Sequence, residues 1–134
     1  MARLHVLAVS ARLPDWAEDA CAEYARRMPR GYELERIAVK DEGRLVVPRG
    51  ARLIALDERG RDYTTAQFAP LLAEPSAFVI GGAEGLSPAL KNRAALLLRL
   101  SSLTLPHALA QVILLEQIYR AATMLTGHPY HRGG

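Results

Sequence analysis

The stretch Ala77-Phe78-Val79-Ile80-Gly81-Gly82-Ala83-Glu84-Gly85-Leu86 joins a short apolar run to a turn rich in glycine. Four apolar residues bounded by turn residues are typical of a buried β-strand, and the first glycine pair ends that strand. Glycine adopts positive φ readily and lets a ligand lie against bare backbone. The spacing differs from the dinucleotide-binding fingerprint, and no phosphate-loop lysine follows it. Alone, the turn indicates either a ligand site or plain turn geometry.

Strands and helices are predicted to alternate on the amino side of this stretch. Asp15 is expected to cap a helix that stops at Pro29 and carries on one face Trp16, Ala20, Cys21, Tyr24 and Met28. Thr64 or Thr65 is expected to cap a short helix that runs through Leu72. Strands are predicted at residues 4–10, 32–39 and 53–56, with a loop at 40–52.

On the carboxyl side the expected pattern continues with two helices. Ser87 and Pro88 are typical of a helix start, and this helix is predicted to run to about Leu97. A short strand is expected near 100–103, followed by the longest helix at 109–125. Gly127 is expected to end that helix.

The alternation of strands and helices predicts an α/β fold with a mostly parallel sheet and helices on both faces. In such sheets ligands bind beyond the carboxyl ends of the strands. Three segments are expected at that edge, namely residues 56–60, 81–86 and 101–107.

Length and composition narrow the class of protein. A chain of 134 residues, half of them hydrophobic, predicts one domain spanning residues 1–134. No apolar window is long enough for a membrane span, and residues 1–10 are typical of a strand and not of a signal peptide, so a cytoplasmic protein is expected. Cys21, the only cysteine, is expected in the core. The net charge of +3 rests on fifteen Arg and two Lys, which suits RNA or reflects a GC-rich genome.

The chain ends in His128-Pro129-Tyr130-His131-Arg132-Gly133-Gly134, directly after the longest predicted helix. Two imidazoles, a phenol and a guanidinium at a chain end indicate either a solvated tail or a functional one. On the preceding helix Glu116 and Arg120 lie four residues apart, which is also the spacing of an ordinary surface ion pair. The segment 101–107 mixes hydroxyls and amides with leucines, which suits an adenine ring or a core strand.

Taken together, these segments closely resemble the ribosomal RNA large subunit methyltransferase H family, which belongs to the SPOUT class of knotted methyltransferases. The resemblance covers essentially the whole chain. It is carried by Pro14-Asp15-Trp16, Tyr24 with Arg26 and Arg27, Leu56-Asp57, the glycine turn 81–86, Leu103-Thr104-Leu105-Pro106-His107, Glu116 with Tyr119-Arg120-Ala121, and the tail 128–132.

The resemblance implies a deep C-terminal trefoil knot, a homodimer, S-adenosylmethionine as methyl donor and no metal. The implied reaction is methylation at N3 of a pseudouridine in helix 69 of 23S ribosomal RNA, on the assembled 70S ribosome. Position by position, the resemblance puts the cofactor pocket at Leu56, Gly82, Ser101, Ser102, Leu103, Thr104, Leu105 and Pro106. It makes Tyr130, His131, Arg132, Glu116 and Arg120 candidates for the catalytic set.

The chemistry that these residues offer agrees with the implied reaction. A sulfonium donor already carries its leaving group, so alignment and a deprotonated nitrogen suffice. His131 is the candidate base, with a purely positioning role as the alternative. The chain departs from the family in residues 40–52, which are short where members carry a longer Lys-rich insertion. The other function left open is a non-catalytic nucleotide- or RNA-binding protein associated with the ribosome.

Overall fold

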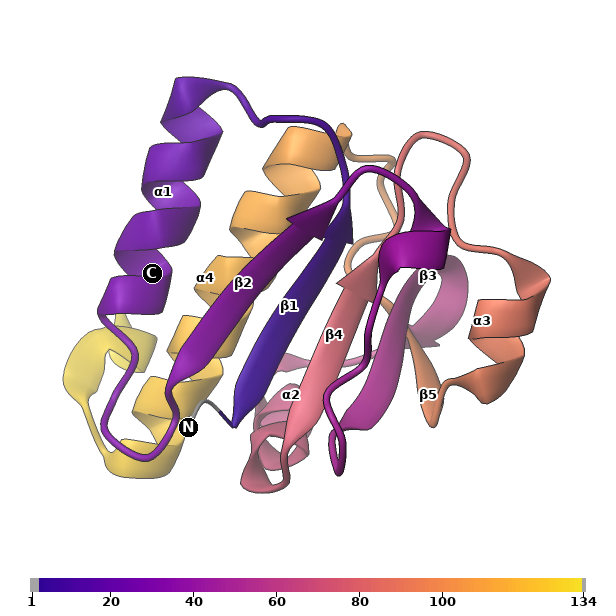
Figure 1. Cartoon of the computed structure of the whole chain (residues 1–134). Coiled ribbons are helices and arrows are strands. Elements are labelled where there is room, and N and C mark those ends of the chain that lie inside the picture. Colours follow the sequence, from indigo (N-terminus) through magenta and orange to yellow (C-terminus); the bar gives the residue numbers. More distant parts are fainter. Residues whose placement is uncertain (1–2, 134) are drawn as a thin grey trace.

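A computed structural model describes residues 3–133 and contains one five-stranded sheet (Figure 1). The strand order is β2-β1-β4-β3-β5, and all four neighbouring pairs are parallel. The strands are β1 (Leu4–Val9), β2 (Leu34–Val39), β3 (Arg52–Asp62), β4 (Ser76–Ile80) and β5 (Leu96–Arg99). Every residue of β4 is buried, as expected for a central strand that is covered on both faces. The apolar run at 77–80 therefore forms the middle of the fold.

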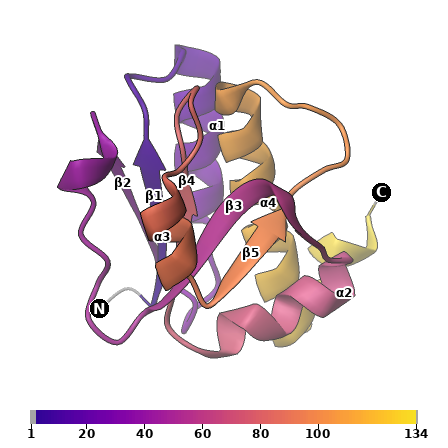
Figure 2. The ribbon, with the colours of Figure 1, turned by 90° about the vertical axis from the view of Figure 1, so that its right-hand side faces the viewer.

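Helices cover both faces of the sheet, which confirms the predicted fold class (Figures 1 and 2). The first face packs against three helical segments, α1 (Asp15–Arg26), α4 (His107–Thr126), and α2 (Thr65–Phe68) with its continuation η2 (Ala69–Ala73). The second face packs against α3 (Pro88–Arg93) and the residues after the short turn η1 (Glu42–Arg44). The chain continues into η3 (Pro129–Arg132), which folds back against α4 (Figure 1).

Most predicted helix ends are confirmed. The hydroxyl of Thr64 accepts a hydrogen bond from the backbone N–H of Gln67, and Ser87 caps α3 through the N–H of Leu90. Gly127 ends α4 with φ of 77°, in the left-handed region that glycine adopts without strain. Asp15 was predicted as a cap, but Pro14 holds that position and Asp15 is the first helical residue. In that position the negative charge of the Asp15 carboxylate still stabilises the helix, because it lies at the positive end of the helix dipole.

Three predicted boundaries, one of a helix and two of strands, are wrong. Helix α3 ends at Arg93, and β5 lies at 96–99 and not at 100–103, because Leu96–Leu98 pair with β3 and extend the sheet by one strand. Strand β3 was expected to end at Leu56 and instead reaches Asp62, through a shift in register with β5 between Leu56 and Arg61. The added residues are mostly exposed, so their sequence lacks the apolar signal of a buried strand.

The buried face of α1 differs from the predicted one. Ala17 and Cys21 are fully buried, which confirms the expected place of the cysteine, and Tyr24 packs against the same cluster. Trp16 was placed on this face but is 56% exposed. The helix turns by about 100° per residue, so Trp16 and Ala17 point in different directions and only Ala17 meets the sheet. In the described part of the chain, no helix has the length and apolarity needed to cross a membrane.

Candidate active site

The three segments predicted at the carboxyl edge of the sheet line one cavity of about 630 Å³. This volume lies within the usual range for small-molecule sites. Seven of the eight predicted cofactor residues line it, and the eighth, Pro106, caps α4 beside it. Figure 2 shows the loop at 100–106 projecting beyond β5, where it forms one wall. The lining residues include Leu56, Gly82, Ser101, Ser102, Leu103, Thr104 and Leu105.

The glycine turn forms the opposite wall, and at Gly81 its backbone leaves no room for a side chain. A Cβ atom on Gly81 would lie 2.7 Å from the carbonyl carbon of Gly85 and 2.9 Å from the backbone nitrogen of Leu86. Gly85 has φ of 74° and donates its N–H to the carbonyl of Gly82 at 2.9 Å. At its glycines the turn thus presents bare backbone to the cavity, which favours close approach of a flat or polar ligand.

Side chains complete the cavity with one ion pair and an apolar rim. The Lys91 ammonium lies 3.3 Å from a carboxylate oxygen of Asp57, whose side chain is only 9% exposed. Leu103 is 74% exposed at the rim, and its N–H bonds to the hydroxyl of Ser101 at 2.9 Å, which orders the loop. An exposed leucine above polar backbone suits a ligand with an aromatic face and a hydrogen-bonding edge.

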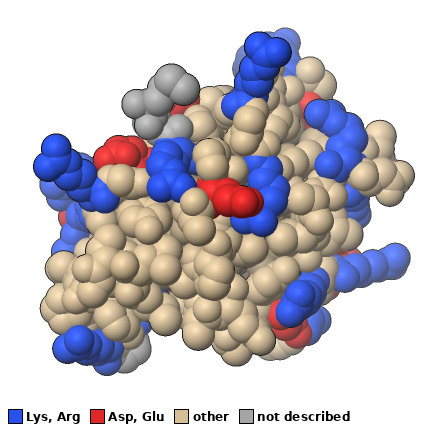
Figure 3. All heavy atoms as spheres, turned by 90° about the horizontal axis from the view of Figure 1, so that it is seen from below, with Lys and Arg blue, Asp and Glu red and all other residues tan. Residues whose placement is uncertain are grey.

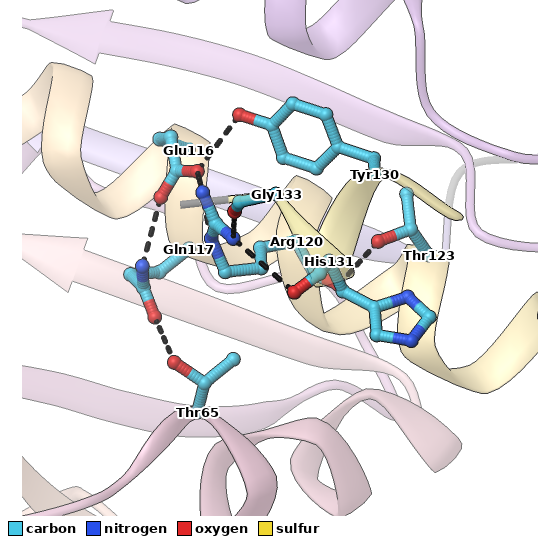
Figure 4. Close-up of polar contacts among 8 residues, drawn as sticks. All are labelled: Thr65, Glu116, Gln117, Arg120, Thr123, Tyr130, His131 and Gly133. Carbon is cyan, nitrogen blue, oxygen red and sulfur yellow. Dashed lines mark hydrogen bonds and ion pairs between the residues drawn. The ribbon is translucent and has the colours of Figure 1, made fainter. Parts of the chain in front are cut away.

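The chain's tail is docked on α4 by a cluster of polar contacts (Figure 4). The Tyr130 hydroxyl donates to Oε2 of Glu116 at 2.9 Å, and Arg120 Nη2 lies 2.8 Å from the same oxygen. Arg120 Nη1 also donates to the carbonyl of Gly133 at 2.9 Å. The Tyr130 ring meets the edge of Tyr119 at a centroid distance of 4.6 Å. The segment 130–133 is therefore bound along its length and is not a free tail.

The second carboxylate oxygen of Glu116 is also engaged. Gln117 donates to Glu116 Oε1 at 2.8 Å, and the Thr65 hydroxyl donates to Gln117 at 2.8 Å, so the chain of contacts reaches α2 (Figure 4). The hydrogen bond to Glu116 raises the pKa of Arg120. Burial, together with hydrogen bonding to Tyr24 and Glu116, raises the pKa of Tyr130 far above its usual range. Glu116 and Arg120 thus act on the position of the tail.

His131 and Arg132 remain available for other contacts. Arg132 is exposed, and the imidazole of His131 points away from the ion pair of Glu116 and Arg120 (Figure 4). Nδ1 of His131 is buried and has no hydrogen-bond partner among residues 3–133. These are the two tail side chains whose polar groups the docking contacts leave unused.

The cavity and the tail do not meet within one chain. The lining residues of the cavity end at Ala110, at the start of α4. Glu116 lies six residues beyond Ala110, which is about 9 Å along the helix axis. The sequence-predicted cofactor residues therefore come together at one place and the predicted catalytic residues at another.

The whole chain matches one family of proteins. Residues 2–131 fit the family model described as "Predicted SPOUT methyltransferase". The chain belongs to the SPOUT methyltransferase family. Within this SPOUT family it is similar to proteins named ribosomal RNA large subunit methyltransferase H. The protein of that name from Paraburkholderia phymatum is 46% identical over 154 aligned positions, which cover 97% of this chain and 99% of the relative. The protein from Burkholderia mallei is equally similar.

Solved SPOUT-like structures share the fold. A probable methylase family protein from Haemophilus influenzae superposes with a TM-score of 0.67 at 12% identity, over 96% of this chain and 70% of that one. The SpoU methyltransferase AviRb from Streptomyces viridochromogenes, in complex with the cofactor AdoMet, superposes with a TM-score of 0.52 at 14% identity, over 92% of this chain and 60% of that one. At these identities the likeness concerns the fold alone.

Sequence reasoning missed several residues that line the cavity. Asp57, Lys91 and His107 belong to it, although none was placed in the predicted cofactor or catalytic set. Lys91 is one of only two lysines in the chain, and this scarcity could have pointed to it as a candidate site residue. Among residues 3–133, no three His, Cys, Asp or Glu side chains are grouped in a way that could hold a metal ion.

Proposed function

We propose that this chain transfers a methyl group from S-adenosylmethionine to N3 of a pseudouridine in helix 69 of 23S ribosomal RNA, on the assembled 70S ribosome. The observation that carries the proposal is the similarity of nearly the whole chain, at 46% identity, to proteins named ribosomal RNA large subunit methyltransferase H. The family model and the cavity at the carboxyl edge support it.

The cavity fits the proposed cofactor by size and by chemistry. Its leucines, Leu56, Leu103 and Leu105, offer apolar surface to an adenine ring, and the backbone at Gly82 and Ser101 offers hydrogen bonds to the ring's edge. Asp57 is a buried acceptor for hydroxyl groups such as those of a ribose. The cofactor supplies a methyl group on a sulfonium, and the protein's part is to hold the acceptor nitrogen in line with it.

A homodimer gives the separated cavity and tail a common site. In this proposal the tail of one protomer, with Tyr130, His131 and Arg132, closes over the cavity of the other. Helices α1 and α4 pack side by side and expose the apolar side chains Trp16 and Leu109, which suits an interface built on these helices. Symmetry then brings two tails to two cavities.

The tail residues have separate tasks in the proposed reaction. Arg132 is exposed and suits a phosphate oxygen of the RNA. His131 is the candidate base that accepts the N3 proton. Glu116 and Arg120 hold the tail in place from α4. N3 lies on the pairing edge of the base, so the target nucleotide must be unpaired or extruded.

Other consequences of the family stay predictions. They are the deep trefoil knot in the C-terminal part, one domain spanning residues 1–134 and a place in the cytoplasm. On the face seen in Figure 3, blue Lys and Arg side chains lie at several separate places, with acidic groups beside some of them. RNA binding is therefore expected to depend on the dimer and on local contacts near the site.

Methyl transfer from tritiated S-adenosylmethionine to 70S ribosomes tests the proposal. The ribosomes come from a strain of the same organism that lacks this protein, and nuclease mapping locates the label. We expect label at one pseudouridine of helix 69 and none on ribosomes from the parent strain, which are already methylated. Ribosome binding without any transfer would instead support the non-catalytic ribosome-associated protein.

A further inference from the structure

A second cavity lies on the other side of the glycine turn, between the carboxyl ends of β1, β2 and β4. Its volume is about 840 Å³, and it is lined by residues 9–11, 40–42, 82–88 and His107. Figure 1 shows the connections that follow these three strands gathered at the upper edge of the sheet. Of the predicted cofactor residues, only Gly82 lines this cavity. The proposed cofactor therefore does not account for the ligand of the second cavity.

The two cavities adjoin each other. Residues 82–86 and His107 line both of them, and Glu84 and His107 are the titratable side chains that border both within the described part of the chain. Gly82 lines both cavities and packs closely against the end of β1, where a Cβ atom would lie 3.0 Å from the carbonyl oxygen of Val9. Because Gly82 has no side chain, it contributes only backbone to the border between the two cavities.

A chain of buried polar contacts leads from the second cavity to this border. Gln111 is 2% exposed on an otherwise apolar part of α4, and its Nε2 lies 2.8 Å from Nε2 of His107. The same amide nitrogen donates to the hydroxyl of Ser10 at 3.4 Å. A buried amide is costly unless it is hydrogen-bonded, and here its partners are the two side chains that face the cavity. Gln111 thus fixes the orientation of His107 and Ser10.

The charged groups of the second cavity leave one cation free. Glu42 accepts hydrogen bonds from the backbone N–H of Ser87, at 2.8 Å, and from its hydroxyl, so this carboxylate fastens the 40–52 loop to α3. The hydrogen bonds from Ser87 lower the pKa of Glu42. Asp41 is paired with Arg44 at 3.1 Å. Lys40 has no ion-pair partner among residues 3–133 and is exposed at the cavity.

We propose that the second cavity receives the acceptor nucleotide, with its phosphate on Lys40 and its base beside Ser10 and His107. An ammonium suits a phosphate oxygen, and a hydroxyl with an imidazole suits the carbonyl and N–H groups of a uracil-type base. The shared border puts that base next to the cofactor cavity. This inference rests on the proposed methyl transfer and assigns the substrate side of the same site.

Steady-state kinetics on ribosomes test the assignment with a matched pair of variants. Lys40→Ala removes the cation at the cavity, and Arg93→Ala removes an exposed cation of α3 that lines neither cavity. We expect Lys40→Ala to raise the KM for ribosomes about tenfold, the worth of one charge-assisted hydrogen bond, with the affinity for S-adenosylmethionine within twofold of wild type. Arg93→Ala is expected to leave both constants unchanged. Equal KM values for the two variants would overturn the assignment.

A binding measurement separates failure of this inference from failure of the proposed reaction. Uridine 5′-monophosphate is titrated into the ¹⁵N-labelled protein, and inorganic phosphate is titrated in parallel. We expect the nucleotide to shift the amide signals of Ser10, Lys40 and Glu84, and phosphate to shift Lys40 alone. Shifts confined to residues 101–106, or the same shifts with phosphate, would overturn the inference whether or not the wild-type protein methylates. If the wild-type protein shows these shifts but transfers no methyl group, the proposed reaction is contradicted and nucleotide binding in the second cavity is still supported.

Discussion

The carboxyl edge of the sheet and the docked tail are built in different ways. At the edge, one wall of the first cavity includes backbone that only glycine permits, as at Gly81. At the tail, the contacts run between side chains, from Tyr130 and Arg120 to Glu116. The edge is tied to the central strand of the fold, whereas the tail rests on side chains of α4 and on Tyr24 of α1.

Because of this difference, we expect the cavity to bind the cofactor and the tail to align the acceptor nitrogen. The cavity at the edge is complete within one chain, so cofactor binding is expected without the tail. The tail carries two side chains, His131 and Arg132, whose polar groups make no hydrogen bond in the docking contacts among residues 3–133. Variants at the two regions are therefore expected to change different constants, and the following predictions test that division.

Deletion of residues 130–134 is expected to have the largest effect. Methyl transfer to ribosomes should fall about 100-fold or more, because the acceptor nitrogen is no longer aligned. The Kd for S-adenosylmethionine, measured by calorimetry, should stay within twofold, since no residue beyond Ala110 lines the cavity. A Kd that rises in step with the loss of activity would show that tail and cavity are one unit.

Gly81→Ala, in contrast to the tail deletion, is expected to weaken the binding of S-adenosylmethionine. The new Cβ would lie 2.7 Å from backbone atoms that cannot move independently, so the turn must shift and the Kd for S-adenosylmethionine should rise about tenfold or more. Gly133→Ala is the matched control in the tail, where a Cβ meets only the Tyr130 carbonyl at an ordinary 3.5 Å. Its cofactor affinity should equal that of wild type. Unchanged binding in Gly81→Ala would refute the role of the glycine turn.

Tyr130→Phe tests how much the hydrogen bond to Glu116 contributes to docking of the tail. It keeps the packing against Tyr119 and loses the hydrogen bond to Glu116, so urea unfolding should show a loss of roughly 1 kcal/mol. The rate of methyl transfer should fall about threefold to tenfold as docking weakens. Tyr32→Phe is the control, because its hydroxyl has no hydrogen bond within residues 3–133. Equal losses of stability and of methyl-transfer rate in the two variants would show that this hydrogen bond does not hold the tail in place.

The smallest expected effect is a pH dependence of tail docking. Burial raises the pKa of Tyr130 in the docked tail, whereas a freed tail has an ordinary phenol with a pKa of about 10. A raised pKa in the docked state means that docking is fully favoured below pH of about 10 and is lost as the pH rises further. Tyrosinate absorbance of wild type and Tyr130→Phe should therefore differ only above that pH. A Tyr130 that titrates at a pH of about 10, as a free phenol does, would contradict the docked state.

Much of the fold was readable from the sequence, because its signals are local. The apolar run at 77–80, the caps at Thr64 and Ser87 and the stop at Gly127 each predict their structure from a few neighbouring residues. The prediction failed where neighbours in space decide. Strand β3 continues through charged residues because β5 offers backbone partners, and Trp16 is exposed because Ala17 takes the place against the sheet.

The sequence by itself determined the order of the elements, the family resemblance and the three segments that line the first cavity. These properties follow from short patterns, since parallel strands bring their carboxyl ends to one edge. Only the tertiary structure decided that the tail folds back onto α4 at Glu116 and Arg120, because no local residue pattern specifies where a chain end docks. It likewise decided that Glu116 holds the tail, and that His107 borders two cavities.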